Sequence, residues 1–377
     1  MPVLSRADTS MLGRWWWTVD RWTLLAILVL IGFGYVMMLA ASPAVAERIH
    51  QARELFILKQ VFFLVLAALV VVVVSLLSPR GVRRVALAGC AVALLLTAVT
   101  VIAGVEIKGA RRWISLPGMT LQPSEFLKPC FAVVAAWLLA EARRETSRLR
   151  GLAWTGLAVA VAGLIALLLK SQPDVGMLAV IVGVFFLQLF VNGLNLVVAG
   201  GLLGGLVAAA VAAYEFFPHV RSRVTRFIDP ASGDNWQVSR AMEAFGNGGF
   251  LGRGPGEGHV KDLIPDAHAD FVFAVAGEEF GMAVCLVILG VFAFIVLRAM
   301  LRVLAERELF VVLATTGLAA GFGLQAFVNM GSTLRLIPTK GMTLPFVSYG
   351  GSSVVAVALG IGMLLALTRR RHNGELL

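Results

Sequence analysis

Long intervals without a charged residue are the feature that most constrains this chain. About 20 apolar residues are needed for a helix to cross roughly 30 Å of hydrocarbon, so each such interval predicts a membrane-spanning helix. The intervals are 22–46, 60–79, 85–105, 151–169, 175–214, 280–297, 309–334 and 341–368. One of them, 175–214, is twice as long as one span needs and predicts two helices, separated by the turn-forming Asn192-Gly-Leu-Asn195. The shorter run 129–140 predicts a span only if Glu125 and Lys128 enter the membrane with it. The sequence therefore predicts an all-α, polytopic integral membrane protein with ten transmembrane helices.

Composition agrees with this class and suggests how the chain is divided. The 377 residues are 59% hydrophobic and 14% charged, with a mean hydropathy of +0.88, beyond the usual balance of a soluble domain. We expect a cytoplasmic N-terminal tail over 1–21, whose following span is too long for a cleavable signal. A membrane domain is expected over 22–368, including one large extracytoplasmic loop over 215–269. A cytoplasmic C-terminal tail is expected over 369–377.

The distribution of basic residues predicts the orientation. Ten spans place both termini on one side, and the tails and turns of that side hold half of the 32 Lys and Arg. Short basic turns such as Arg143-Arg144 and Arg369-Arg370-Arg371 are typical of a cytoplasmic face, so both termini are expected in the cytoplasm. The net charge of +10 indicates affinity for anionic lipid rather than nucleic acid.

The tryptophans and cysteines have simple interpretations. An interfacial belt is expected at the start of the first span, formed by Trp15, Trp16, Trp17 and Trp22. The cysteines all lie in predicted spans: Cys90, Cys130 and Cys285. Because they lack paired spacing, they are interpreted as small apolar residues rather than disulfides or metal ligands.

Two polar segments on the expected outer side precede the run 129–140. They are Lys108-Gly-Ala-Arg-Arg-Trp-Ile114 and Gln122-Pro-Ser-Glu-Phe-Leu-Lys128, and their candidate substrate-binding residues are Lys108, Arg111, Arg112, Trp113, Gln122, Ser124, Glu125 and Lys128. Pro123 and Ser124 suit a helix start, and Glu125 and Lys128 share one face at i, i+3. The alternative is an interfacial cap with a self-neutralising ion pair, although nothing in water-free lipid needs such a pair.

Two further segments on that side supply candidates. In Gln172-Pro-Asp-Val-Gly176 they are Gln172 and Asp174, although Pro-Asp alone is ordinary turn chemistry. In the segment 338–353 they are Lys340, Ser348, Gly350 and Ser352. Small residues at the start of the last helix either allow close helix packing or present free backbone N–H groups to an anion.

The loop over 215–269 carries a glycine-rich stretch at 246–258. A nucleotide-binding glycine loop needs a preceding strand and a following helix in a βαβ unit, which is not predicted here, so a Rossmann or P-loop site is rejected. The glycines favour either flexible backbone that approaches a bulky polar ligand or a mobile lid.

The same loop ends in Ile264-Pro-Asp-Ala-His-Ala-Asp-Phe271, where the next apolar run begins. Ionisable groups at a membrane boundary are costly to desolvate and tend to persist where they do chemistry. Asp270 is therefore the candidate catalytic carboxylate, and the alternative is an N-cap of the following helix. His268 is expected to hydrogen-bond nearby, while Glu278 and Glu279 either line a polar cavity or pair with Arg or Lys.

Together these segments resemble the SEDS proteins (shape, elongation, division and sporulation). The matching stretches run in the family's order along the chain: 109–114 with 122–128, 172–176, 264–271 and 345–353. Leu336-Ile-Pro-Thr-Lys-Gly341 resembles the FtsW division branch, with the RodA branch as second choice. The family commonly has His-Thr-Asp where this chain has His268-Ala269-Asp270, which puts a role for that threonine in doubt but not the aspartate's.

The resemblance implies a ten-helix peptidoglycan glycosyltransferase that polymerises lipid II outside the bacterial inner membrane during septal cell-wall synthesis. It also implies that Asp270 is the family's essential loop aspartate and that Glu125 and Lys128 form its membrane ion pair. The implied partners are a class B penicillin-binding protein, which is a transpeptidase, and other division proteins.

The implied reaction assigns a role to each kind of candidate. Asp270 would take the proton of the acceptor hydroxyl, a contribution of about 10²–10⁴-fold, while direct displacement inverts the anomeric centre and gives a β-1,4 link. Undecaprenyl pyrophosphate departs as an anion if cations meet it, and the candidate cations are Lys108, Arg111, Arg112 and Lys340. No cofactor is firmly expected; a divalent cation, Mg or Mn, could assist, but no ligand cluster is visible in the sequence.

Two other functions remain open at this point. A lipid II flippase or transporter would also have many spans with charges inside the membrane, although its polar residues would not gather on one face. A non-catalytic scaffold in a division complex is the third hypothesis.

Overall fold

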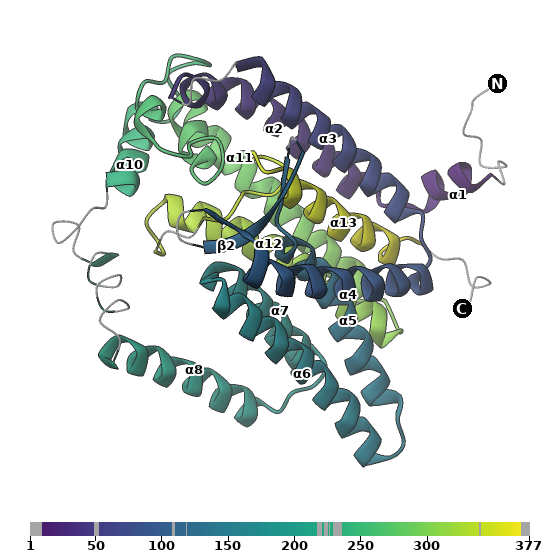
Figure 1. Ribbon diagram of the computed structural model, residues 1–377. Helices are drawn as coiled ribbons and strands as arrows, with labels where there is room; N and C mark the ends of the chain where they lie inside the picture. Colours follow the sequence, from purple (N-terminus) through teal and green to yellow (C-terminus); the bar gives the residue numbers. More distant parts are fainter. Residues whose placement is uncertain are drawn as a thin grey trace.

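The chain folds into a bundle of long helices with a small sheet (Figure 1). The structure, a computed structural model, describes residues 10–48, 53–107, 110–117, 119–216, 221, 225, 227–228, 236–338 and 341–370. The helices up to the large loop are α1 (Met11–Thr18), α2 (Arg21–Arg48), α3 (Arg53–Ser75), α4 (Pro79–Ala103), α5 (Ser124–Arg144), α6 (Arg148–Ser171), α7 (Val175–Val191) and α8 (Leu196–Phe216). After these come α10 (Trp236–Gly248), the 3-10 helix η2 (Val260–Leu263), α11 (Val272–Val303), α12 (Leu309–Thr333) and α13 (Gly351–Leu367).

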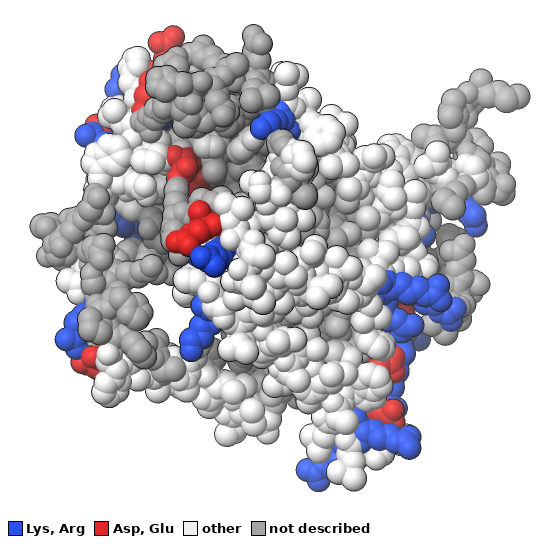
Figure 2. All heavy atoms as spheres, in the orientation of Figure 1, with Lys and Arg blue, Asp and Glu red and all other residues white. Residues whose placement is uncertain are grey.

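Every charge-free interval contains or overlaps a helix, and the break expected at 192–195 separates α7 from α8. Among the described residues, six helices are long and apolar enough to cross a membrane, namely α2, α3, α4, α6, α11 and α12. Three apolar helical segments are shorter there: α7, α13 and Leu196–Ala208 of α8. With α5, this arrangement accommodates ten spans, and that count stays a prediction. Uncharged surface forms a broad belt between two charged zones, as lipid-facing helices require (Figure 2).

Helix α5 lies at the centre of the bundle, in contact with α4, α6, α7, α12 and α13. Its side chains are buried along most of its length, including Phe131 and Leu139. Protein rather than lipid therefore surrounds this helix. That position explains how a span can carry Glu125 and Lys128, because their charges never face hydrocarbon.

A small antiparallel sheet between α4 and α5 departs from the all-α expectation. Its strands are β1 (Val105–Ile107), β2 (Ala110–Leu116) and β3 (Met119–Leu121), in the order β1-β2-β3. Val105 pairs with Trp113, and Ser115 pairs with Thr120. Gly109 and Pro117-Gly118 divide the segment between the two helices into short runs that contain the β-branched Val105, Ile107 and Ile114, and strand pairing satisfies the backbone of these runs.

The glycine-rich stretch packs backbone to backbone against a break in α11. Gly281 has φ 79°, and the loop carbonyls of Gly249 and Phe250 accept hydrogen bonds from the N–H groups of Met282 and Ala283. A Cβ on Gly252 would lie 2.2 Å from the Glu279 carbonyl oxygen, so only glycine fits there. The interpretation as a mobile lid or a ligand-facing loop is therefore wrong for this part of the stretch: its glycines permit close packing.

The two ends of the described chain meet on one side of the bundle, as an even number of spans requires. The backbone N–H of Arg370 donates to the Thr18 carbonyl at 3.0 Å. Trp15 is buried, and its indole N–H donates to Ser75 Oγ at 2.8 Å. The belt interpretation is thus wrong for Trp15, which anchors α1 to α3, while Trp17 and Trp22 remain exposed as expected.

Candidate active site

Asp270 lies at the entrance to α11, at the end of the bundle where α5, α7, α11 and α13 begin; we call this end the site end. A turn holds its backbone, because the N–H groups of Ala269 and Asp270 both donate to the Asp266 carbonyl, at 2.9 and 3.0 Å. Phe271 occupies the N-cap of α11, so Asp270 stands one residue before that position. The capping role of Asp270 stays an alternative to the catalytic one. Its carboxylate is half-buried beside Gly341, where an added Cβ would lie 3.2 Å from Asp270 Oδ2.

The residues before α13 hold the turn segment that carries Asp270 in place. The Ser348 hydroxyl donates to the Ala269 carbonyl at 2.6 Å, and the Tyr349 N–H donates to the His268 carbonyl at 2.9 Å. The rings of His268 and Tyr349 lie 5.2 Å apart. These bonds engage the backbone of 268–269, so replacement of the family's threonine by Ala269 leaves them in place.

A hydrogen-bonded chain connects the buried ion pair with the segment beside Asp270. Lys128 Nζ lies 2.7 Å from Glu125 Oε2, which confirms the expected pairing, and donates to Gln325 Oε1 at 2.6 Å. The Gln325 amide then donates to the Thr343 carbonyl at 3.0 Å. One turn further along α12, the Asn329 amide donates to the carbonyls of Met342 at 2.6 Å and of Asp270 at 3.0 Å. Side chains of α12 therefore connect the Glu125–Lys128 ion pair of α5 with the backbone that holds Asp270.

Sequence reasoning missed Gln325 and Asn329. They stand at i, i+4 inside the apolar interval 309–334, on one face of α12. Two buried amides at that spacing in a membrane span need hydrogen-bond partners, and this requirement could have identified them as functional candidates from the sequence.

Arg112 holds the turn before α7. Its Nε donates to the Gln172 carbonyl at 2.7 Å, one Nη donates to the Pro173 carbonyl at 2.6 Å, and the other lies 3.4 Å from Asp174 Oδ2. This guanidinium already has three acceptors, so it is less available to a phosphate than the sequence suggested. Arg111, on the other face of β2, lies 3.4 Å from Glu106 and is half exposed, and Trp113 on the same strand is partly buried.

Gln172 and Asp174 both stabilise the ends of helices. The Gln172 amide donates to Thr100 Oγ1 at 2.6 Å, while Asp174 caps α7 by accepting from the Met177 N–H at 3.2 Å. Burial raises the pKa of Asp174, although the charge of Arg112 opposes that change. The charges of Glu125 and Lys128 also act on this carboxyl group, which places the turn and the buried ion pair in one electrostatic unit.

The start of α13 joins β3 and α5 to the same unit. The Gln122 N–H donates to Ser352 Oγ at 3.3 Å, and the Gln122 amide donates to Ser124 Oγ at 3.3 Å. Gly350 is the N-cap of α13. A Cβ on Gly351 would lie 2.6 Å from the Phe63 ring, so the small residues here provide close helix packing, one of the two alternatives. Of the remaining candidates, Lys108 and Lys340 lie outside the described residues.

Glu278 and Glu279 anchor the large loop to α11. Glu278 accepts three backbone hydrogen bonds, from the N–H groups of His259, Val260 and Lys261 at 2.8 to 3.0 Å. Glu279 forms a buried ion pair with Lys261, whose Nζ also donates to the Ala40 carbonyl at 3.0 Å. The interpretation that these residues pair with a cation is confirmed for Glu279.

The fold and the site define a class: a polytopic helical membrane protein with a half-buried carboxylate and arginines at one end of its bundle. The chain belongs to the SEDS family, because the FtsW/RodA/SpoVE family model, described as cell cycle protein, matches residues 21–373. Within this family its similarity to curated relatives places it in the FtsW branch.

Two curated relatives show how far the similarity extends. The probable peptidoglycan glycosyltransferase FtsW of Caulobacter vibrioides (strain NA1000 / CB15N) is 40% identical over 374 residues, which cover 98% of this chain and 94% of the relative. The probable peptidoglycan glycosyltransferase FtsW of Trichlorobacter lovleyi is 35% identical over 357 residues, which cover 93% of each chain.

Solved structures share the fold. A chain from a peptidoglycan synthase complex that coordinates polymerization and crosslinking matches with a TM-score of 0.77 and 27% identity, over 93% of this chain and 97% of that chain. The rod shape determining protein RodA of Thermus thermophilus matches with a TM-score of 0.69 and 27% identity, over 94% of this chain and 97% of RodA.

Proposed function

We propose that this protein is a peptidoglycan glycosyltransferase that polymerises lipid II by inverting transfer during septal wall synthesis. Its relatives carry that enzymatic name, and its polar candidates gather at one end of the bundle. The new bond is a β-1,4 link, and undecaprenyl pyrophosphate is the leaving group.

The placement of Asp270 is the observation that carries this proposal. Its backbone is fixed by Asp266 and Asn329, and its carboxylate is half-buried at the bundle's end, within reach of a membrane-anchored substrate. A carboxylate held in this way can accept the proton of the acceptor sugar hydroxyl as that oxygen attacks the anomeric carbon. The pre-formed position removes a reorganisation step from the reaction.

Cations near the site end would neutralise the departing pyrophosphate. Arg111 is the strongest of these candidates, because its guanidinium is half exposed and, among the described residues, pairs with one carboxylate, Glu106. Arg112 positions the Gln172–Asp174 turn. Lys108 and Lys340, which lie outside the described residues, are candidates because of their charge. A guanidinium can bind phosphate oxygens through two parallel hydrogen bonds.

The described residues contain no group of three or more His, Cys, Asp or Glu that could hold a metal ion. Mg or Mn therefore has no protein ligand set of that kind in the described part of the chain. The proposed steps assign charge neutralisation to arginine and lysine, and a divalent cation that arrives with the substrate pyrophosphate is compatible with them.

The test is polymerisation of labelled lipid II by the purified full-length protein, with its transpeptidase partner present. We expect Asp270→Asn to lower the rate at least about 100-fold, since it removes the base and keeps the size. Asp262→Asn is the matched control, because this exposed carboxylate lies in the same loop, and it should retain activity. Equal rates for wild type and Asp270→Asn would exclude this role for Asp270.

The same preparation separates the rival functions. Lipid II movement across vesicles without polymer, unaffected by Asp270→Asn, would identify a flippase. A scaffold predicts neither polymer nor lipid movement, and growth that survives Asp270→Ala.

The proposed orientation places the site end in the periplasm and the termini in the cytoplasm of an inner-membrane protein at the division septum. Short basic turns at the opposite end support it. The proposed partner is a class B penicillin-binding protein, supported by the solved synthase complex that shares this fold. Its membrane helix would pack on an apolar, small-residue surface of the bundle.

A further inference from the structure

A large cavity opens at the end of the bundle opposite Asp270, and none of the residues discussed for catalysis line it. Its volume is about 1320 Å³, larger than the ~300–1,000 Å³ typical of small-molecule pockets. It lies between the start of α4, the ends of α5, α11 and α13, and the turn before α12. Eight arginines line it: Arg80, Arg83, Arg144, Arg298, Arg302, Arg307, Arg369 and Arg370. We call it the arginine cavity.

In the described part of this end, the carboxylates do not balance the arginines. Glu306 and Glu308 are the carboxylates among the described lining residues, and Glu306 Oε1 accepts from the backbone N–H groups of Arg307 and Glu308 at 2.9 and 3.0 Å. Asp20, behind the wall, engages Arg298 and Arg302, while Glu308 lies 3.7 Å from Arg144. Among the described residues, no carboxylate forms an ion pair with Arg80, Arg307 or Arg370.

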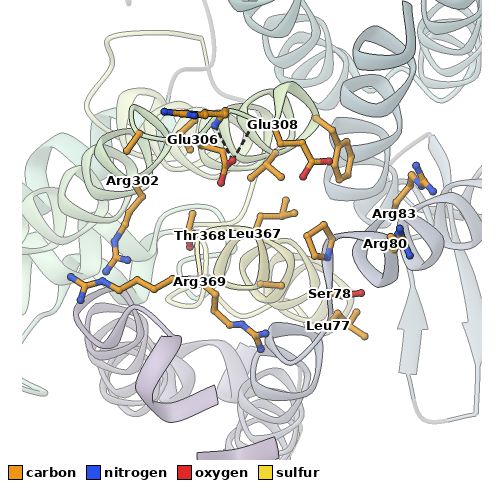
Figure 3. A pocket seen from close by; sticks show the side chains of 18 of the residues that line it. Leu77, Ser78, Arg80, Arg83, Arg302, Glu306, Glu308, Leu367, Thr368 and Arg369 are labelled. Atoms are coloured by element: carbon orange, nitrogen blue, oxygen red, sulfur yellow. Dashed lines mark hydrogen bonds between the residues drawn. The ribbon is translucent and has the colours of Figure 1, made fainter. Parts of the chain in front are cut away.

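These cations surround one space. Arg302 and Arg369 line one end of the cavity and Arg80 and Arg83 the opposite end, with Leu367 and Thr368 between them (Figure 3). Like charges around a shared concave surface repel each other, and a bound polyanion relieves that repulsion.

Apolar side chains in the same cavity indicate what carries the negative charge. Leu77, Leu301 and Phe310 line it together with the arginines, and Leu301 is 67% exposed on the outer surface of α11. A soluble phosphate compound has no apolar group to pack against these side chains. A membrane lipid presents phosphate and acyl chain together, and basic pockets between membrane helices are suited to such head groups.

We propose that the arginine cavity binds the head group of an anionic phospholipid, with a two-phosphate head group preferred over a one-phosphate head group. The preference follows from arginines at both ends of a cavity too large for one phosphate. The proposal rests on the cavity alone and is independent of the reaction at Asp270.

The test measures binding of a fluorescently tailed two-phosphate phospholipid to the purified full-length protein in neutral detergent at fixed salt. The variant Arg80→Gln/Arg307→Gln/Arg370→Gln removes three cavity charges, and its matched control, Arg84→Gln/Arg148→Gln/Arg150→Gln, removes three exposed charges outside the lining at the same end. Each arginine near an anionic head group contributes about fivefold, so the cavity variant should lose on the order of 100-fold in affinity. The control should lose less than about threefold.

Three further measurements decide the identity of the ligand. Tight lipid binding with a one-phosphate lipid at least about tenfold weaker supports the proposal. Equal losses in the two triple variants would overturn it, because they would indicate general surface charge. Equal competition by a soluble diphosphate would overturn the lipid assignment. Binding that appears only after removal of 371–377 would show that the chain's own C-terminal segment is the occupant, which also overturns it.

Discussion

The two charged ends of the bundle solve the problem of polar groups at a membrane in opposite ways. At the site end, polar side chains are linked into one network that runs from Glu125 and Lys128 through Gln325 to the segment beside Asp270. At the other end, the described residues that line the arginine cavity include eight arginines and two glutamates. The first arrangement fixes a carboxylate in place, whereas the second leaves positive charge available to a ligand. The comparison shows two uses of polar groups. Groups that hydrogen-bond to one another can hold a reactive side chain in position, whereas surplus positive charge can attract an anionic ligand.

The largest expected effect tests the internal pairing at the site end. Lys128→Met leaves Glu125 buried without its counter-charge, which should cost about 3–5 kcal/mol of unfolding free energy. Denaturant unfolding of the purified protein measures this. The double variant Glu125→Gln/Lys128→Met is the control and should recover most of the stability without recovering polymerisation. A single variant as stable as wild type would break the comparison.

The next effect concerns Asp20, a carboxylate behind the arginine cavity that pairs with two of its arginines. Asp20 accepts from Arg298 at 2.6 and 2.9 Å and lies 3.1 Å from Arg302. We expect Asp20→Asn to cost about 2–3 kcal/mol, below the full penalty because both guanidinium groups stay partly hydrated.

The pH dependence of that effect has a definite sign. Burial alone would raise the pKa of Asp20, but hydrogen bonds from Arg298 and Thr23 and the charge of Arg302 lower it below its ordinary 3.8. The stabilisation is therefore fully present above pH 3.8 and is lost as pH falls through the lowered pKa. Thermal unfolding should show a constant difference between wild type and Asp20→Asn from pH 7 to pH 5. A difference that shrinks in that window would contradict the assignment.

A smaller effect tests how closely the site end is fitted around Asp270. Gly341→Ala places a Cβ 3.2 Å from Asp270 Oδ2, so the carboxylate must move by a few tenths of an ångström. We expect about a 5–10-fold loss of polymerisation rate with unchanged stability, since small misplacements of a catalytic group are costly. Gly163→Ala is the control, because no heavy atom lies within 4 Å of that added Cβ. Equal rates for all three proteins would show that the site tolerates movement.

The smallest effect on stability is expected at Arg111. Its ion pair with Glu106 is exposed, so Arg111→Gln should change unfolding free energy by less than about 1 kcal/mol. If Arg111 meets the pyrophosphate, the same variant should raise the KM for lipid II severalfold. Arg84→Gln at the opposite end is the control for net charge. An unchanged KM would remove Arg111 from the proposed site.

Much of this architecture was predictable because membrane spans follow simple rules of length and charge. The break in 175–214 and the i, i+3 ion pair of α5 both emerged from spacing alone. The roles of Arg112 and Asp174 did not, because their partners lie on segments about 60 residues apart in the chain. The glycine stretch was misinterpreted for the same reason: its partner is the backbone of α11 around Gly281, and a single glycine inside an apolar run does not by itself predict a break in the helix.

Helix α13 packs along α3, although nearly 300 residues separate them in the chain: Gly351 lies against Phe63, and Gly362 against Val74. Synthesis proceeds from the N-terminus, so α3 enters the bilayer long before its main partner exists. Until the ribosome completes the last helix, lipid must cover that face of α3. A protein truncated before α13 therefore exposes the uncovered face of α3 within an otherwise inserted bundle. Cellular quality control could recognise that face.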